Sequence, residues 1–308
     1  MPSGVAIRLA IGALAAAFGT DLTTPRVAHA QTLLSLPTHG HAAARAVAWQ
    51  VRQIHVPWRH APFHYHVRRV GLTQPAGAPR LTVLLHGLGG DATSWLRQGN
   101  IDAVLTRLIE CGELPAGLVV AVSGDNGYWT DWADGKHEYG ALVWRDLVTD
   151  LRRRSELPAD PKDRALVGVS MGAFGALSIA LRYPGTFGRV LALSPADMNV
   201  AVRTPRAPGI YRRMFGSPVS MVRLRAVNPQ DIVRDGRPIV VERIVLRWGT
   251  AEVAKFSKGG AELAKLLAAR LVSREWTGTL DAREVAGGHH GWVTWNRALE
   301  EGLASLWR

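Results

Sequence analysis

The sequence ALVGVSMGAFGALSIAL, residues 165–181, changes from a short apolar run to a helical pattern at a single serine. The run 165–169 is typical of a buried parallel strand, and residues 173–181 are typical of a buried helix. Gly168, Ser170 and Gly172 form a G-x-S-x-G motif at the junction. Small residues allow a tight strand–turn–helix bend there, which exposes the serine at the N-terminus of the helix. The stretch therefore predicts Ser170 as a nucleophile.

Further apolar runs on both sides of this stretch predict a mostly parallel sheet. They occupy residues 81–85, 117–122, 190–193 and 244–246. Helical patterns lie between or after them, at about residues 101–111, 139–154, 172–182, 260–271 and 292–307. Alternating patterns at 46–55 and 63–70 predict an antiparallel pair before the parallel strands. Residues 46–308 are thus expected to form a single doubly wound α/β domain.

Residues 197–240 interrupt this alternation of strands and helices. They contain several prolines and many arginines, with one helical piece around 210–215. We expect an insertion here, placed over the strand ends where binding loops belong.

The first thirty residues predict a cleavable signal peptide. Arg8 precedes an apolar run at 9–18, and Ala28-His29-Ala30 offers small residues at the cleavage positions, so cleavage is expected after Ala30. The run is too short to span a bilayer, which disfavours the alternative of a retained anchor, and no other segment could span one. Residues 31–45 look like a loose leader. The protein is expected to be secreted, periplasmic or held in the cell envelope.

The composition sets limits on partners and cofactors. The 308 residues carry a formal charge of +12, but the basic residues are scattered and no RNA- or DNA-binding motif occurs, so no nucleic-acid partner is expected. Cys111 is the only cysteine, which excludes an internal disulfide, and it is expected to be a small core residue. His64 and His66 would share a strand face without a nearby Cys or acidic ligand, so no metal or other cofactor is expected. The oligomeric state stays open.

A serine nucleophile needs a base and an acid. Gly287 and Gly288 precede two adjacent histidines, His289 and His290, after the last expected strand. Either histidine could be the base on position alone. Glu252 lies on the loop after the strand at 244–246, in the chain order serine, acid, histidine, and it is the expected acid.

A glycine-rich loop, residues 86–90, follows the strand at 81–85 and is expected to help stabilise an oxyanion. The donors would be the backbone N–H groups of Leu88 and Met171. A phosphate-binding loop is the competing interpretation, but neither G-x-x-x-x-G-K-[ST] nor G-x-G-x-x-G is present.

From about residue 46 to the C-terminus the sequence resembles the esterase D family of α/β hydrolases. The resemblance rests on four motifs: LHGLGG at 85–90 with Trp95, YWTDW at 128–132, SMGAFGAL at 170–177 and HGWVTW at 290–295. It implies the α/β-hydrolase fold. It also favours His290 over His289, because the family histidine is followed by tryptophans at the spacing of Trp292 and Trp295. Glu252 after a Gly-Thr pair is similar to the glutamate version of the family acid, found in mycolyltransferases.

The expected function is an exported serine carboxylic-ester hydrolase that acts through an acyl-enzyme. Its substrate would be an envelope lipid, a polysaccharide or a small ester, with Trp129, Trp132 and Trp292 in the acyl or sugar-facing wall. One alternative is acyl transfer to a sugar, as mycolyltransferases perform it. A binding module without activity is the third, disfavoured because every part of the triad is present.

Overall fold

The computed structural model describes residues 48–71, 80–203 and 209–308. The expected signal peptide at 1–30 and the leader at 31–45 lie outside these residues. Within the described ranges, none of the helices combines the length and the apolar character needed to cross a membrane.

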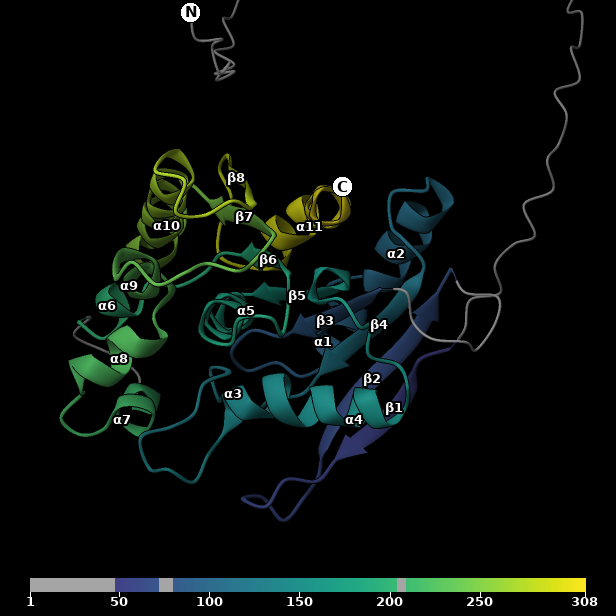
Figure 1. Ribbon diagram of the computed structural model, residues 1–308, viewed down its shortest axis with the longest axis horizontal. Coiled ribbons are helices and arrows are strands. Elements are labelled where there is room, and N and C mark those ends of the chain that lie inside the picture. Colours follow the sequence, from purple (N-terminus) through teal and green to yellow (C-terminus); the bar gives the residue numbers. More distant parts are fainter. Residues whose placement is uncertain (1–47, 72–79, 204–208) are drawn as a thin grey trace, which may run out of the picture. The chain divides into compact units, whose positions relative to one another are not determined.

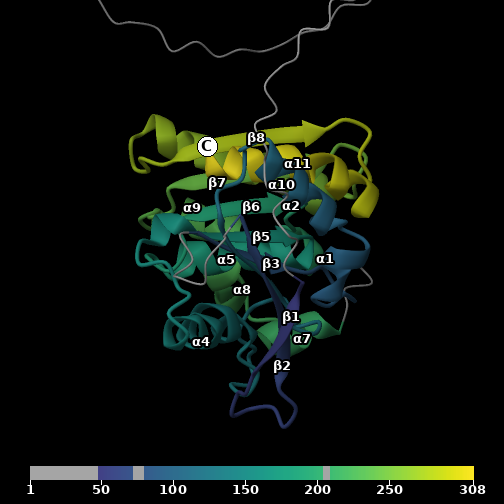
Figure 2. The same cartoon turned by 90° about the vertical axis from the view of Figure 1, so that its right-hand side faces the viewer.

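A single eight-stranded sheet organises the described chain, in the order β1-β2-β4-β3-β5-β6-β7-β8. Its strands are β1 (Gln50–Ile54), β2 (Phe63–Val70), β3 (Leu81–Leu85), β4 (Gly117–Val122), β5 (Arg164–Val169), β6 (Arg189–Leu193), β7 (Arg243–Gly249) and β8 (Thr279–Val285). β2 pairs antiparallel with β1 and with β4, and the other pairings are parallel. Figure 2 shows the strands succeeding one another from β8 at one end to β1 and β2 at the other. The expected antiparallel start and parallel continuation are confirmed.

Helices cover both faces of the sheet, which explains why every residue of β3, β4, β5 and β6 is buried. One face carries α1 (Thr93–Arg97), α2 (Ile101–Glu110) and α11 (Trp292–Trp307). The other carries α5 (Met171–Arg182), α10 (Ala254–Val272) and a helix made of α3 (Tyr139–Ala141), a π-helical segment (Leu142–Leu147) and α4 (Val148–Arg153). Figure 1 shows α2 and α11 on one side of the strands and α4, α5 and α10 on the other. Two apolar layers result, one on each face.

The segment between β6 and β7 forms the expected insertion, but it is more helical than predicted. In addition to α7 (Ile210–Phe215) it contains α6 (Met198–Ala201), α8 (Met221–Val227) and α9 (Pro229–Arg234). Side-chain caps begin two of these short helices: Asp197 accepts from the N–H of Asn199, and Ser220 accepts from the N–H of Arg223. These helices are too short to show a helical period in the sequence, so only their capping residues could have indicated them.

The expectation for Cys111 was wrong, because the residue is exposed. Helix α2 ends at Glu110, and Cys111 follows as its C-terminal cap, with its N–H bonded to the carbonyl of Arg107. The apolar stripe of α2 therefore stops at Leu108, one turn before the cysteine.

Candidate active site

Ser170 stands at the sharp bend between β5 and α5. Its backbone has φ 54° and ψ −114°, a conformation that costs free energy in a residue with a side chain. A Cβ on Gly172 would lie 2.0 Å from the carbonyl oxygen of Leu85, and one on Gly168 would lie 2.1 Å from the carbonyl oxygen of Gly172. Because these obstacles are backbone atoms, only glycine fits at either position. The bend expected from the G-x-S-x-G motif is present.

His290 reaches this serine from the loop between β8 and α11. Its Nε2 lies 2.8 Å from the Oγ of Ser170. The ring stacks on Phe256 with 3.6 Å between centroids, and the ring of Trp295 stands nearly perpendicular to it, with 5.1 Å between centroids. His289 is exposed and does not make the contact with Ser170. Of the two adjacent histidines, the structure thus brings His290 to Ser170, with its ring in contact with Phe256 and Trp295.

Glu252 faces the other side of the imidazole and is fully buried. Its Oε1 lies 3.4 Å from Nδ1 of His290 and accepts a 2.5 Å hydrogen bond from the hydroxyl of Ser194. Ser194 in turn accepts from the indole N–H of Trp295 at 2.9 Å. Within the described residues the second carboxylate oxygen, Oε2, has no hydrogen-bond donor. The carboxylate is therefore oriented through the one oxygen that faces His290.

Sequence reasoning missed Ser194 and Phe256. Ser194 directly follows β6, so it shares the carboxyl edge of the sheet with Ser170 and Glu252. That position was the available signal. Phe256 lies in the first turn of α10, and nothing in its local pattern distinguishes it from a core residue.

The glycine-rich loop after β3 lies beside the serine. The N–H of Gly89 donates to Oδ1 of Asn126 at 2.7 Å, and the N–H of Gly90 donates to the carbonyl of Gly87 at 3.1 Å. Within the described chain the N–H of Leu88 has no acceptor. Met171 is the first residue of α5, where N–H groups lack an intrahelical acceptor. Both expected oxyanion donors are thus free to serve a ligand.

His86 anchors the base of this loop from the core. Its Nε2 accepts the N–H of Gly124 at 3.0 Å, so the proton is on Nδ1, which donates to the carbonyl of Gly87 at 2.7 Å. Burial lowers the pKa of His86, which keeps the ring neutral. The neutral ring in this tautomer thus holds both the glycine-rich loop, through Gly87, and the loop after β4, through Gly124.

A cavity of about 350 Å³ opens beside Ser170 and His290. Its walls combine the loop 87–90 with the aromatic rings of Tyr128, Phe256, Trp292 and Trp295. Trp292 thus lies where the sequence placed it, in the wall beside the serine.

The other two expected tryptophans lie elsewhere. Trp129 is fully buried beneath the site, where a Cβ on Gly124 or Gly175 would collide with it, and its indole N–H donates to the carbonyl of His86. It supports the loop and does not line the cavity. Trp132 lines a neighbouring hollow of about 420 Å³, which shares Leu88 with the cavity.

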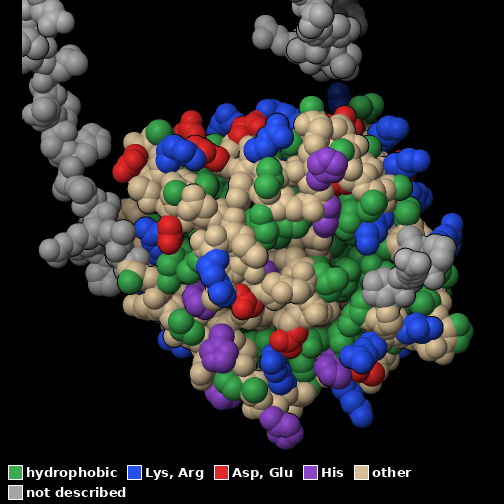
Figure 3. Space-filling view, turned by 180° about the vertical axis from the view of Figure 1, so that it is seen from behind, with side chains coloured by type: hydrophobic (Ala, Val, Ile, Leu, Met, Phe, Trp, Pro, Cys, Tyr) green, Lys and Arg blue, Asp and Glu red, His purple; other side chains and the backbone are tan. Residues whose placement is uncertain are grey.

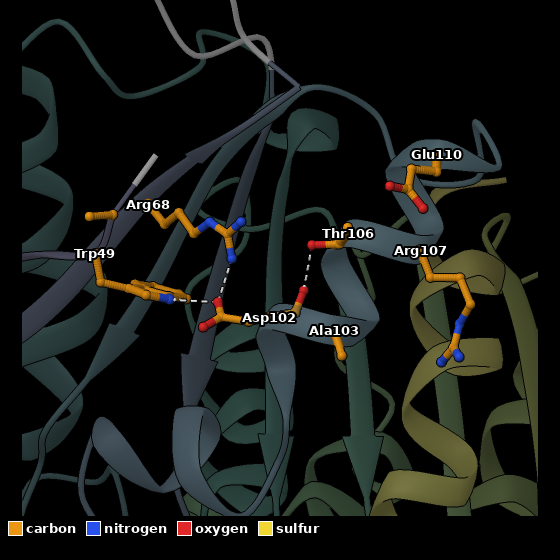
Figure 4. Close-up of a pocket in the computed structure, with 8 residues that line it drawn as sticks. Trp49, Arg68, Asp102, Ala103, Thr106, Arg107 and Glu110 are labelled. Atoms are coloured by element: carbon orange, nitrogen blue, oxygen red, sulfur yellow. Dashed lines mark hydrogen bonds and ion pairs between the residues drawn. The ribbon is translucent and has the colours of Figure 1, made fainter. Parts of the chain in front are cut away.

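The remaining hollows and charged groups on the surface of the described residues do not form a second reactive site. A hollow of about 550 Å³ lies between β2 and α2, where Asp102 accepts hydrogen bonds from Trp49 and Arg68 (Figure 4). The Asp102 carboxylate thus pairs with both donors, while Nε of Arg68 has no hydrogen-bond partner among the described residues. Basic side chains are scattered over the face seen in Figure 3 and form no continuous patch. In the described part of the chain, no three His, Cys, Asp or Glu side chains are grouped to hold a metal ion.

Comparisons with known proteins agree with this geometry. The Esterase family model, described as "Putative esterase", matches residues 62–306. An acetyl esterase of Caldicellulosiruptor saccharolyticus is 27% identical over 147 residues, 45% of this chain and 53% of that protein. An endo-1,4-beta-xylanase/feruloyl esterase of Xylanibacter ruminicola is 31% identical over 128 residues, 40% of this chain and 18% of that protein. The matches thus span about half of the first relative and under a fifth of the second.

Solved structures confirm the fold. A ferulic acid esterase superposes with a TM-score of 0.64 at 19% identity, over 85% of this chain and 99% of that chain. An S-formylglutathione hydrolase of Staphylococcus aureus gives 0.68 at 16% identity, again over 85% and 99%. MPT51 of Mycobacterium tuberculosis gives 0.59 at 18% identity, over 85% and 100%. The α/β-hydrolase fold expected from the sequence is present.

Proposed function

The chain belongs to the Esterase family, and on this premise we propose that it is a serine carboxylic-ester hydrolase with Ser170 as its nucleophile. One observation carries the proposal: the Oγ of Ser170 lies 2.8 Å from Nε2 of His290, at the tip of a strained bend. A serine hydroxyl needs such a base to attack a carbonyl.

The reaction has two halves. The Oγ of Ser170 bonds to the ester carbonyl carbon while His290 takes the hydroxyl proton, and the buried carboxylate of Glu252 stabilises the imidazolium. The N–H groups of Leu88 and Met171 hold the oxyanion. His290 then gives its proton to the departing alcohol, which leaves an acyl-enzyme. Water, deprotonated by His290, attacks this acyl group, and the acid departs as Ser170 regains its proton.

The cavity supports a small acyl group. Its volume of about 350 Å³ is near the lower end of the ligand-pocket range of roughly 300–1,000 Å³. We infer that an acetyl or an aromatic acyl group enters beside Trp292, while the alcohol, small or part of a polysaccharide or lipid, remains nearer the solvent. The names of the relatives, acetyl esterase and feruloyl esterase, agree with such acyl groups.

Export is the second part of the proposal. Arg8, the apolar run at 9–18 and Ala28-His29-Ala30 support cleavage by a signal peptidase after Ala30. N-terminal sequencing of protein recovered outside the cytoplasm of an expressing bacterium should give Gln31 as the first residue. Protein that keeps Met1 and stays with the cytoplasmic fraction would contradict export.

The enzymatic part is tested by three proteins: wild type, Ser170→Ala and Ser178→Ala. Ser178 is a matched control, because it lies in the same helix, is fully buried, and its hydroxyl has no hydrogen-bond partner among the described residues. Wild type and Ser178→Ala should release acetate from p-nitrophenyl acetate and bind about one equivalent of a fluorophosphonate, whereas Ser170→Ala should do neither. Equal rates and labelling in all three proteins would refute the proposal.

A further inference from the structure

Lys255 brings a positive charge into the cavity beside Ser170. It is the second residue of α10, three residues after Glu252, and it lines the cavity together with Ser170 and His290. Among the residues that the structure describes, no Asp, Glu or Arg contributes to the same wall. Within the described part of the chain, Lys255 is thus the one Lys, Arg, Asp or Glu that a bound ester would meet in this wall.

The ammonium group of Lys255 has no acidic partner in the described ranges. Among the described residues no carboxylate forms an ion pair with it, although many of the arginines are paired. Its Nζ lies 4.8 Å from the ring centroid of Phe256. That ring in turn stacks on His290. The charge therefore lies one aromatic ring away from the base.

Burial of this lysine without a counter-ion costs free energy. Burial lowers the pKa of Lys255, and among the described residues no neighbouring acid raises it. A bound anion would supply the missing partner. A charge-assisted hydrogen bond to an ammonium is stronger than one between neutral groups, and most so where water is excluded.

We propose that Lys255 makes the site selective for esters that carry a negative charge, such as a carboxylate, a few atoms from the scissile carbonyl. The proposal rests on the esterase function above and names its substrate class. The acyl wall of aromatic rings and the single cation then act together: the rings hold the uncharged part, and Lys255 holds the anionic group.

The test compares matched esters that differ in charge. One pair, 4-acetoxybenzoate and 4-acetoxybenzamide, places the charge on the alcohol side, and a second pair, monomethyl adipate and methyl hexanoate, places it on the acyl side. The readout is the ratio of kcat/KM for the anionic and the neutral member in wild type, Lys255→Met and Lys255→Arg. Lys258→Met is the control, because Lys258 is exposed on the same helix and does not line the cavity.

For at least one pair the ratio should fall about tenfold or more in Lys255→Met, the loss expected for one charge-assisted contact. Lys255→Arg should retain most of the ratio, and Lys258→Met all of it. A ratio unchanged in Lys255→Met for both pairs would overturn the proposal. This includes the case of an equal loss on both members of both pairs, which indicates only a structural role. Hydrolysis of the neutral esters by wild type, and its loss in Ser170→Ala, tests the esterase function separately.

Discussion

Replacement of Glu252 by glutamine removes a charge from the site while it keeps the shape of the side chain. The Glu252 carboxylate lies 3.4 Å from Nδ1 of His290 and is fully buried, so the two groups interact with little screening once the imidazole is protonated. At an effective dielectric of about 20, unit charges about 4 Å apart attract each other by about 4 kcal/mol. Since this charge pair forms only as Ser170 attacks, its loss raises the barrier rather than weakening substrate binding.

At about 1.4 kcal/mol for each factor of ten, Glu252→Gln should lower kcat by roughly a thousandfold with little change in KM. The assay is p-nitrophenyl acetate hydrolysis at pH 7.5, with Glu284→Gln as control, because Glu284 is an exposed carboxylate on β8. The amide oxygen of the glutamine can still accept from Ser194, and a thermal melt checks that the variant is folded. A folded Glu252→Gln protein with more than a tenth of the wild-type kcat would refute this role for the carboxylate.

Three further predictions concern the framework and the support of the site. Gly172→Ala should lower the free energy of unfolding by about 3 kcal/mol, the upper range for overpacking, because its Cβ would meet a backbone oxygen of β3 at 2.0 Å; a urea midpoint equal to wild type would contradict this. Asp281→Asn should cost about 3 kcal/mol, since it breaks a buried ion pair with Arg247, which is 2% exposed. Burial raises the pKa of Asp281, but the hydrogen bonds from Arg247 and Ser305 outweigh burial and leave the pKa below its usual value. The ion pair therefore stabilises the fold above about pH 4, and this stabilisation is lost as the pH falls through the lowered pKa. Urea melts at pH 7 and pH 3 should therefore differ less in the variant than in wild type, and an equal difference would exclude the pair as a source of acid sensitivity. Ser194→Ala should reduce kcat about tenfold through loss of one buried hydrogen bond, of about 1–2 kcal/mol, to the acid, and an unchanged kcat would show that this bond does not orient the carboxylate.

Much of the sheet follows directly from local patterns. The strands β3 and β4 occupy the residues predicted for them, because a strand covered on both faces must be apolar along its whole length. The bend at Ser170 was equally readable, since backbone atoms exclude any side chain at Gly168 and Gly172. These features depend on neighbours in the sequence, and for that reason the sequence alone predicts them.

The support of the site depends on contacts between distant segments, which no local pattern reports. Ser194 bonds to Glu252 across 58 positions, and the proton donor to Ser194, Trp295, comes from 101 positions away. Trp129 shows the opposite case, in which a residue predicted for the site lies outside it. As an aromatic residue in a family motif it was expected in the pocket wall, yet it lies fully buried under the glycine-rich loop. A large apolar ring fits either place, and packing decides between them.

The start of α10, together with Glu252 just before it, has a consequence for how such an enzyme could change its substrate preference. Within five consecutive positions the chain carries the proposed acid Glu252, the cavity lysine Lys255 and Phe256, whose ring stacks on His290. Replacement of residues 252–256 by the matching segment of another esterase would therefore change the ester selectivity and the orientation of the His290 ring in the same step. Laboratory evolution that targets residues 252–256 should yield variants whose ester selectivity and kcat change together, rather than independently.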